Sequence, residues 1–141
     1  MSSRWALLLL VIVGLTLVAC SASADGSYKK IKPYKLEEVS GSEFKKVKLT
    51  QEAVVRTGIQ VVPAGELTVP YASIVYGNHG EEWVYTNPEP TLFIREEVVV
   101  DRIEGTTEGG TAYLLEGPAP GTLVVTAGAA ELWGTEFGVG K

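Results

Sequence analysis

Short runs of β-forming residues separated by turns, from about residue 67 onward, constrain the fold of this chain most strongly. Valine, isoleucine, threonine and aromatic residues fill the runs, and glycine or proline separates one run from the next. Such residues suit pleated, half-buried strands, and turns at roughly 8–12-residue intervals are typical of small all-β domains. The pattern predicts an all-β fold, a small β-barrel or β-roll of about six or seven short strands.

One short helix is expected before these strands, over residues 51–57. Thr50 suits the N-cap of this helix and Gly58 suits its C-terminal cap. Residues 129–134 are expected to form one further helical turn near the end of the chain.

A β-hairpin is expected around Gly-Asn-His-Gly at residues 77–80, with residues 69–76 as its first strand. Side chains alternate across a strand, so Trp83 and Tyr85 of the second strand should share one face. The long run over residues 91–103 is expected to contain a bulge or bend near Glu96.

The chain's only cysteine, Cys20, follows an uncharged run of 14 residues, 6–19, with Arg4 in front of it. As a helix this run would be roughly 21 Å long, short of the roughly 30 Å hydrocarbon core, so it suits a signal peptide. Leu-Val-Ala-Cys at residues 17–20 matches a bacterial lipobox. We therefore expect residues 1–19 to be a lipoprotein signal peptide and Cys20 to carry the lipid. The alternative is an uncleaved short anchor helix with an incidental cysteine.

Lipidation of Cys20 places the mature protein in the cell envelope, on the extracytoplasmic face of a membrane. Residues 20–43 are expected to be the lipidated cysteine and a flexible tether, and residues 44–141 the β domain. Charge is distributed unevenly along the chain: residues 25–48 carry a net charge of +3, and residues 49–141 carry a net charge of −9. An acidic domain argues against a nucleic-acid partner, which needs a basic surface.

Residues that could support catalysis are scarce. His79 is the only histidine, and no catalytic triad, phosphate-binding motif or metal-ligand spacing accompanies it. The sequence therefore predicts no enzyme activity, no cofactor and no metal. The alternative is a small-molecule or metal-binding lipoprotein that uses His79, Glu81 and Glu82 at the mouth of the barrel.

Aromatic residues offer the best candidates for a partner-binding surface. We choose four such residues: Trp83 and Tyr85 on the hairpin, and Trp133 and Phe137 near the C-terminus. Aromatic side chains are enriched in the cores of protein interfaces.

Several segments resemble the membrane-proximal domain of periplasmic adaptor subunits, the HlyD-like membrane fusion proteins of RND-type efflux pumps. The segments are residues 69–76 (VPYASIVY), 80–85 (GEEWVY), 95–100 (REEVVV), 113–121 (YLLEGPAPG), 124–132 (VVTAGAAEL) and 132–138 (LWGTEFG), with a looser match over residues 47–59. Together they cover about residues 46–138. Pro118 stands where such adaptors usually have leucine.

The chain departs from this family in one respect: it lacks the segments that form the middle of an adaptor sequence. Adaptors insert a long α-helical hairpin, a pair of lipoyl half-motifs and a β-barrel where this chain has only residues 62–67. The resemblance therefore implies a truncated lipoprotein without the part that bridges the envelope. It implies a lipid-anchored interaction module, accessory to an inner-membrane efflux transporter, with membrane lipid as its second partner through Cys20.

Overall fold

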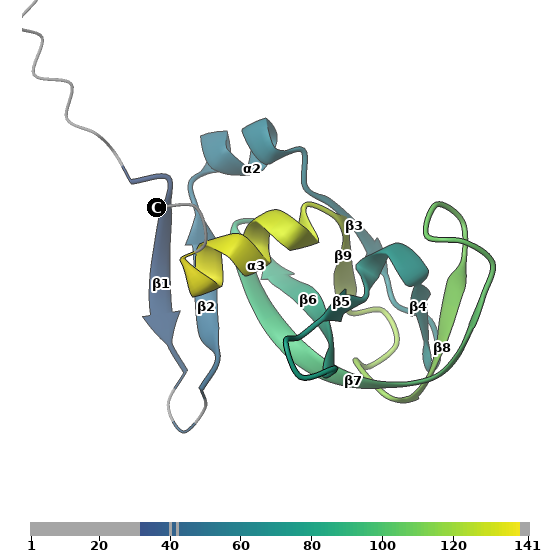
Figure 1. Ribbon diagram of the computed structural model, residues 1–141. Coiled ribbons are helices and arrows are strands. Elements are labelled where there is room, and N and C mark those ends of the chain that lie inside the picture. Colours follow the sequence, from purple (N-terminus) through teal and green to yellow (C-terminus); the bar gives the residue numbers. More distant parts are fainter. Residues whose placement is uncertain (1–31, 40, 42, 139–141) are drawn as a thin grey trace, which may run out of the picture. The chain divides into compact units, whose positions relative to one another are not determined.

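Nine antiparallel strands lie within residues 32–39, 41 and 43–138, the part of the chain that the computed structural model describes. These residues belong to a compact unit, Lys32–Lys141. The strands are β1 (Tyr34–Glu38), β2 (Lys45–Leu49), β3 (Gln60–Pro63), β4 (Thr68–Pro70), β5 (Val75–Tyr76), β6 (Glu82–Glu89), β7 (Leu92–Glu104), β8 (Thr111–Glu116) and β9 (Leu123–Ala127) (Figure 1). The predicted all-β class is confirmed.

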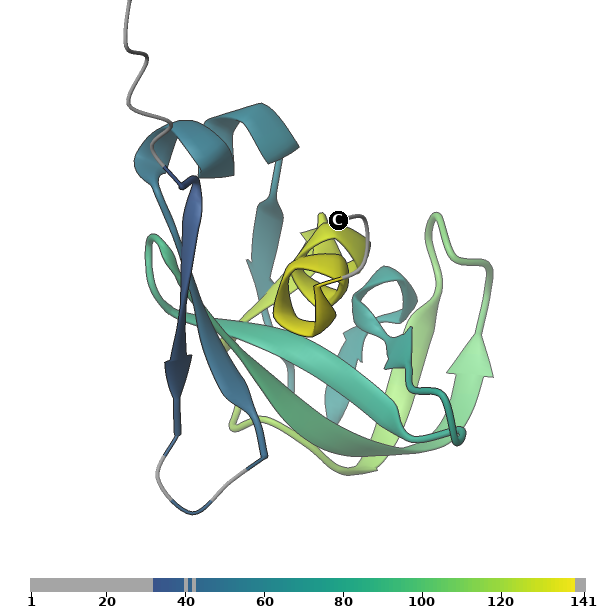
Figure 2. The ribbon, with the colours of Figure 1, turned by 60° about the vertical axis from the view of Figure 1, so that its left-hand side comes forward.

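The sheet follows the order β1-β2-β7-β6-β9-β3, with β5 beside β6 and with β8 joining β7 to β4. Among the described residues, β1 pairs only with β2 and β3 only with β9, so the sheet is not closed. The prediction of a barrel, and of six or seven strands, was therefore wrong. Instead of a closing pair of strands, the helix α3 (Ala129–Phe137) lies over the inner side of the curved sheet (Figure 2).

The long strand β7 connects the two parts of the sheet. Its first half pairs with β2 and β6, and from Val99 onward it pairs with β8. The register shifts between Val99 and Arg102, where one set of partners replaces the other. The expected irregularity thus exists, but it lies beyond Glu96, because the strand keeps its regular pairing with β6 as far as Val98.

The first strand, β1, lies inside the range 20–43 that the sequence assigned to a tether. It pairs with β2 along its whole length, and Glu37 and Glu38 face Lys46 and Lys45 across the ladder. Tyr34 and Leu36 pack against the core. The domain therefore begins about ten residues earlier than predicted, because part of the lysine-rich segment is neutralised by opposite charges on a neighbouring strand.

The two predicted helical segments are both present. In α2 (Gln51–Thr57) the Thr50 hydroxyl accepts a hydrogen bond from the Ala53 amide at 3.2 Å, and Gly58 takes the left-handed conformation with φ 65°. Both predicted caps are confirmed. At residues 129–134 the expected single turn is a nine-residue helix, α3, which begins after Gly128 with φ 89° and ends before Gly138 with φ 70°.

The predicted hairpin is confirmed, since β5 and β6 pair on either side of residues 77–80. Its first half is less regular than expected. Residues 69–76 are divided between the end of β4, a 3₁₀ turn η1 (Tyr71–Ser73) and β5.

Strand β6 is buried on both faces, and its two faces belong to two apolar clusters. Tyr85 joins the first cluster and Val84 the second, as the alternation of side chains requires. The first cluster also contains Val47, Leu49, Ala53, Phe93, Val125, Ala129 and Leu132. The second contains Ala64, Val69, Val98, Ala112, Leu114 and Val124. The side of β6 that α3 covers carries the candidate site.

Candidate functional site

Pairing between β6 and β7 brings four functional side chains onto one face of the sheet. Trp83 lies opposite Glu97, and Tyr85 lies opposite Arg95. Because side chains alternate, the intervening residues point to the other face. The register therefore places an arginine beside the two aromatic residues that the sequence singled out.

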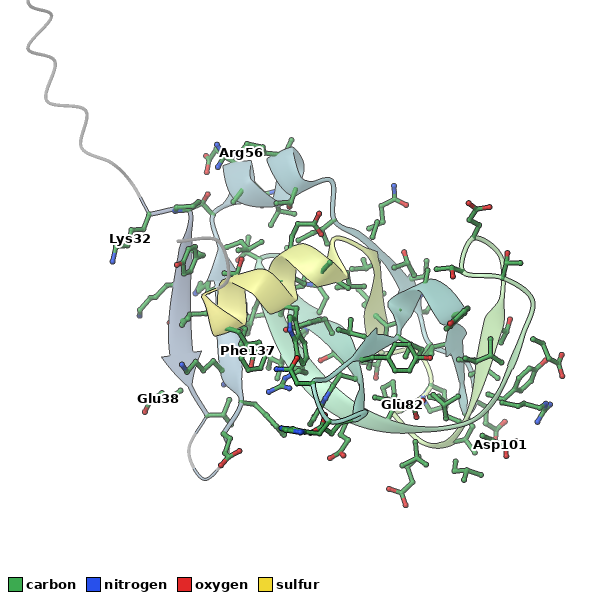
Figure 3. The ribbon with its side chains drawn as sticks, in the orientation of Figure 1. Lys32, Glu38, Arg56, Glu82, Asp101 and Phe137 are labelled. Carbon is green, nitrogen blue, oxygen red and sulfur yellow. The ribbon has the colours of Figure 1, made fainter. Side chains whose placement is uncertain are left out.

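Helix α3 completes the site from above this face. Trp133 and Phe137 are four residues apart, so they neighbour one another on the helix surface, with ring centroids 4.5 Å apart. Glu136, one residue before Phe137, points inward and is 5 % exposed. Figure 3 labels Phe137 at the C-terminal end of the helix.

Arg95 lies at the centre of an aromatic cage and is itself 8 % exposed. Its guanidinium carbon lies 4.2–5.1 Å from four ring centroids: 4.2 Å from Trp83, 4.9 Å from Phe44, 5.0 Å from Phe137 and 5.1 Å from Trp133. Cations within about 6 Å of a ring centroid are attracted by the ring quadrupole. The buried guanidinium thus holds together rings from three separate parts of the chain.

Glu136 supplies the negative charge that buried Arg95 requires. A carboxylate oxygen of Glu136 lies 3.4 Å from a guanidinium nitrogen of Arg95. The Tyr85 hydroxyl donates to the other carboxylate oxygen at 2.7 Å, and the Lys45 amide donates to the first at 3.3 Å. Strands β2, β6 and β7 and the helix are therefore joined at one carboxylate.

Tyr85 is fully buried, and both this burial and its bond to the Glu136 carboxylate raise the pKa of the phenol. Folding therefore favours the protonated phenol. The stabilisation is present below the ordinary tyrosine pKa of about 10 and is lost as pH rises above that value.

We expect Tyr85→Phe to lower the free energy of unfolding by about 1.5–3 kcal/mol at pH 7, because a buried hydrogen bond to a charged group is lost. The difference from wild type should shrink above about pH 10. Urea unfolding at pH 7 and at higher pH measures both. Tyr113→Phe is the control, since its hydroxyl bonds the carboxylate of Glu104 at an exposed position. Equal effects of the two substitutions would contradict the assigned role of Tyr85.

An open pocket of about 450 Å³ lies beside the cage. Its lining combines the aromatic rings and Arg95 with three carboxylates at its rim. The lining residues are Glu43, Phe44, Gly77, Asn78, His79, Glu81, Trp83, Arg95, Glu97, Trp133 and Phe137. Its volume lies within the range of pockets that hold ligands or parts of a partner.

Two hydrogen-bond donors in the pocket wall have no acceptor among the described residues. They are the indole nitrogen Nε1 of Trp83 and the guanidinium nitrogen Nε of Arg95. Both residues are more than nine-tenths buried and both line the pocket. Buried donors are nearly always satisfied in folded proteins, so these two atoms, which have almost no solvent-accessible area, are exceptions.

The structure brings together all four partner-binding candidates chosen from the sequence. Trp83, Trp133 and Phe137 line the pocket, and Tyr85 lies behind it, joined to Arg95 through Glu136. Cys20 lies outside the described residues.

Sequence reasoning missed five residues that complete the site: Glu43, Phe44, Arg95, Glu97 and Glu136. Two signals were present. One is the antiparallel pairing of β6 with β7, which aligns Arg95 with Tyr85, and the other is the three-residue spacing of Trp133 and Glu136. The second is informative only once residues 129–137 are known to be a helix, since positions three apart then share a face.

The alternative set of His79, Glu81 and Glu82 does not converge. The Glu81 carboxylate accepts from the His79 amide at 3.0 Å, whereas the Glu82 carboxylate accepts from the Val100 amide at 2.9 Å. Hydrogen bonds from its own amide and from that of His79 lower the pKa of Glu81. Across the described part of the chain, no group of three or more His, Cys, Asp or Glu side chains is placed to hold a metal ion.

None of the helices in residues 32–39, 41 and 43–138 has the length and apolar character needed to span a membrane. No protein-family model, curated protein or solved structure matches this chain. The resemblance to periplasmic adaptors therefore stays a prediction from the segments quoted above.

Proposed function

We propose that this protein is a non-enzymatic, lipid-anchored binding module of the cell envelope, and that the pocket beside Arg95 receives a segment of an inner-membrane transporter. One observation carries the proposal. Three of the four aromatic residues expected at an interface line a single open pocket, and the fourth supports its wall.

The pocket wall is suited to binding because it is held in place before a partner arrives. Arg95 is fixed by Glu136 and by four rings, and Glu136 is fixed in turn by Tyr85. A preorganised surface loses less conformational entropy when it binds. Tryptophan, tyrosine and arginine are also the residue types most enriched at interface hot spots.

The lipid at Cys20 supports the membrane part of the proposal. A tether to the membrane raises the effective concentration of the domain near membrane proteins, so that weak contacts become occupied. The transporter as partner follows from the resemblance to adaptor membrane-proximal domains.

A pull-down from detergent-solubilised membranes tests this function. The wild-type protein should recover a membrane protein repeatedly, and Phe137→Ala should reduce that recovery about tenfold, as expected for a central aromatic contact. Tyr76→Ala is a matched control, because Tyr76 is 49 % exposed, Phe137 is 51 % exposed, and Tyr76 is not among the residues that line the pocket. Recovery of no membrane protein by the wild type, or equal losses in both variants, would refute the proposal.

A further inference from the structure

The rim of the pocket is negatively charged. Glu43, Glu81 and Glu97 line it, and the one arginine there is already paired with Glu136 at 3.4 Å. Hydrogen bonds from backbone amides lower the pKa of Glu81, which keeps it ionised at neutral pH. A ligand that carries positive charge is therefore favoured at the rim, and a free anion is repelled.

The rest of the lining includes aromatic rings. Phe137 is 51 % exposed and its ring centroid lies 4.5 Å from that of Trp133, so the pocket offers an apolar surface beside the rim carboxylates.

We infer that the occupant of this pocket is a lysine- or arginine-containing peptide segment, whose cationic side chains meet the three rim carboxylates while its apolar side chains pack on Phe137 and Trp133. A polypeptide can carry apolar groups and positive charges at adjacent positions. The exposed part of Phe137 and the neighbouring Trp133 ring offer apolar contact to the rest of the segment. The inference rests on the proposed function, for which it names the chemistry of the partner.

Binding of two short peptides tests this inference. The full-length protein in non-ionic detergent is titrated with fluorescent capped pentapeptides that alternate lysine with valine, or glutamate with valine, and anisotropy is read against empty micelles. The lysine peptide should bind about tenfold or more tightly than the glutamate peptide, and its affinity should fall as salt is raised.

Two triple variants separate the rim from the overall charge of the domain. Replacing the rim carboxylates by Glu43→Gln, Glu81→Gln and Glu97→Gln should weaken binding of the lysine peptide about tenfold or more. The control triple, Glu52→Gln, Glu66→Gln and Glu116→Gln, removes the same charge at exposed positions outside the pocket and should change affinity less than about twofold.

Several outcomes would overturn the inference: no binding of the lysine peptide, equal binding of both peptides, or equal effects of the two triple variants. Displacement of the lysine peptide by inorganic phosphate would instead assign the pocket to an anion. The pull-down distinguishes this inference from the proposed function. If the rim triple variant recovers the partner as well as wild type does, the peptide chemistry is wrong and the binding module stands; if wild type recovers nothing, the function itself fails.

Discussion

Glu136→Leu should lower the free energy of unfolding by about 3–5 kcal/mol, a larger effect than we expect from Tyr85→Phe at the same site. The substitution removes a carboxylate that is 5 % exposed and leaves the Arg95 guanidinium, which is 8 % exposed, without its counter-charge. It also removes the acceptor of the Tyr85 hydroxyl and of the Lys45 amide. Urea unfolding followed by circular dichroism measures the loss.

A double-mutant cycle separates the ion pair from simple packing. Arg95→Met leaves Glu136 buried without its partner and should also cost about 3–5 kcal/mol. The double variant, Arg95→Met with Glu136→Leu, buries neither charge, so it should be less destabilised than the sum of the two single variants by at least about 1 kcal/mol. Glu131→Leu is the control, because Glu131 is exposed on the same helix and should change stability by less than about 0.5 kcal/mol. Additive single effects would show that Arg95 and Glu136 do not act as a pair.

Cys20→Ala should abolish incorporation of labelled palmitate, because it removes the thiol that would carry the lipid. Each buried CH₂ of an acyl chain contributes about 0.8 kcal/mol to membrane affinity, and stable anchoring needs more than one chain, which a diacylated thiol supplies. The β domain does not depend on Cys20, since residues 32–138 carry both apolar clusters. Its unfolding transition should therefore be unchanged.

Ser21→Ala is the control for the lipidation experiment, because it alters the neighbouring residue and leaves the thiol in place. A further variant with a cleavable secretory signal in place of residues 1–20 removes both the thiol and the apolar run. Absence of palmitate incorporation by the wild type together with release of this variant would indicate the uncleaved anchor helix instead of a lipid.

Local signals in the sequence predicted the elements that depend on a few adjacent residues. Thr50 and Gly58 bound the first helix because capping requires particular side chains and backbone conformations at those positions. The hairpin at residues 77–80 was predictable for the same reason. The start of the domain was not, because β1 is a charged segment whose strand conformation depends on lysines of β2 that face Glu37 and Glu38.

Whether the sheet closes depends on pairing between strands that are far apart in the sequence. The pattern of strands along the sequence could not predict this pairing. Counting strands does not reveal that β1 and β3 pair with one neighbour each among the described residues, or that α3 covers the inner side of the sheet. Trp83, Tyr85, Trp133 and Phe137 were recognisable from their residue type, whereas Phe44 was missed. Arg95 and Glu136 were not recognisable, because a charge in a strand or helix looks solvent-exposed until the partner that buries it is known.

The central claim is that the pocket beside Arg95 receives a membrane protein, and photocrosslinking in intact cells tests it most directly. A photoreactive phenylalanine analogue is placed at position 137, which lines the pocket, or at position 76, which does not and is similarly exposed. We expect one discrete adduct with a membrane protein from position 137 and none from position 76. No adduct at position 137, or the same adducts from both positions, would contradict the claim.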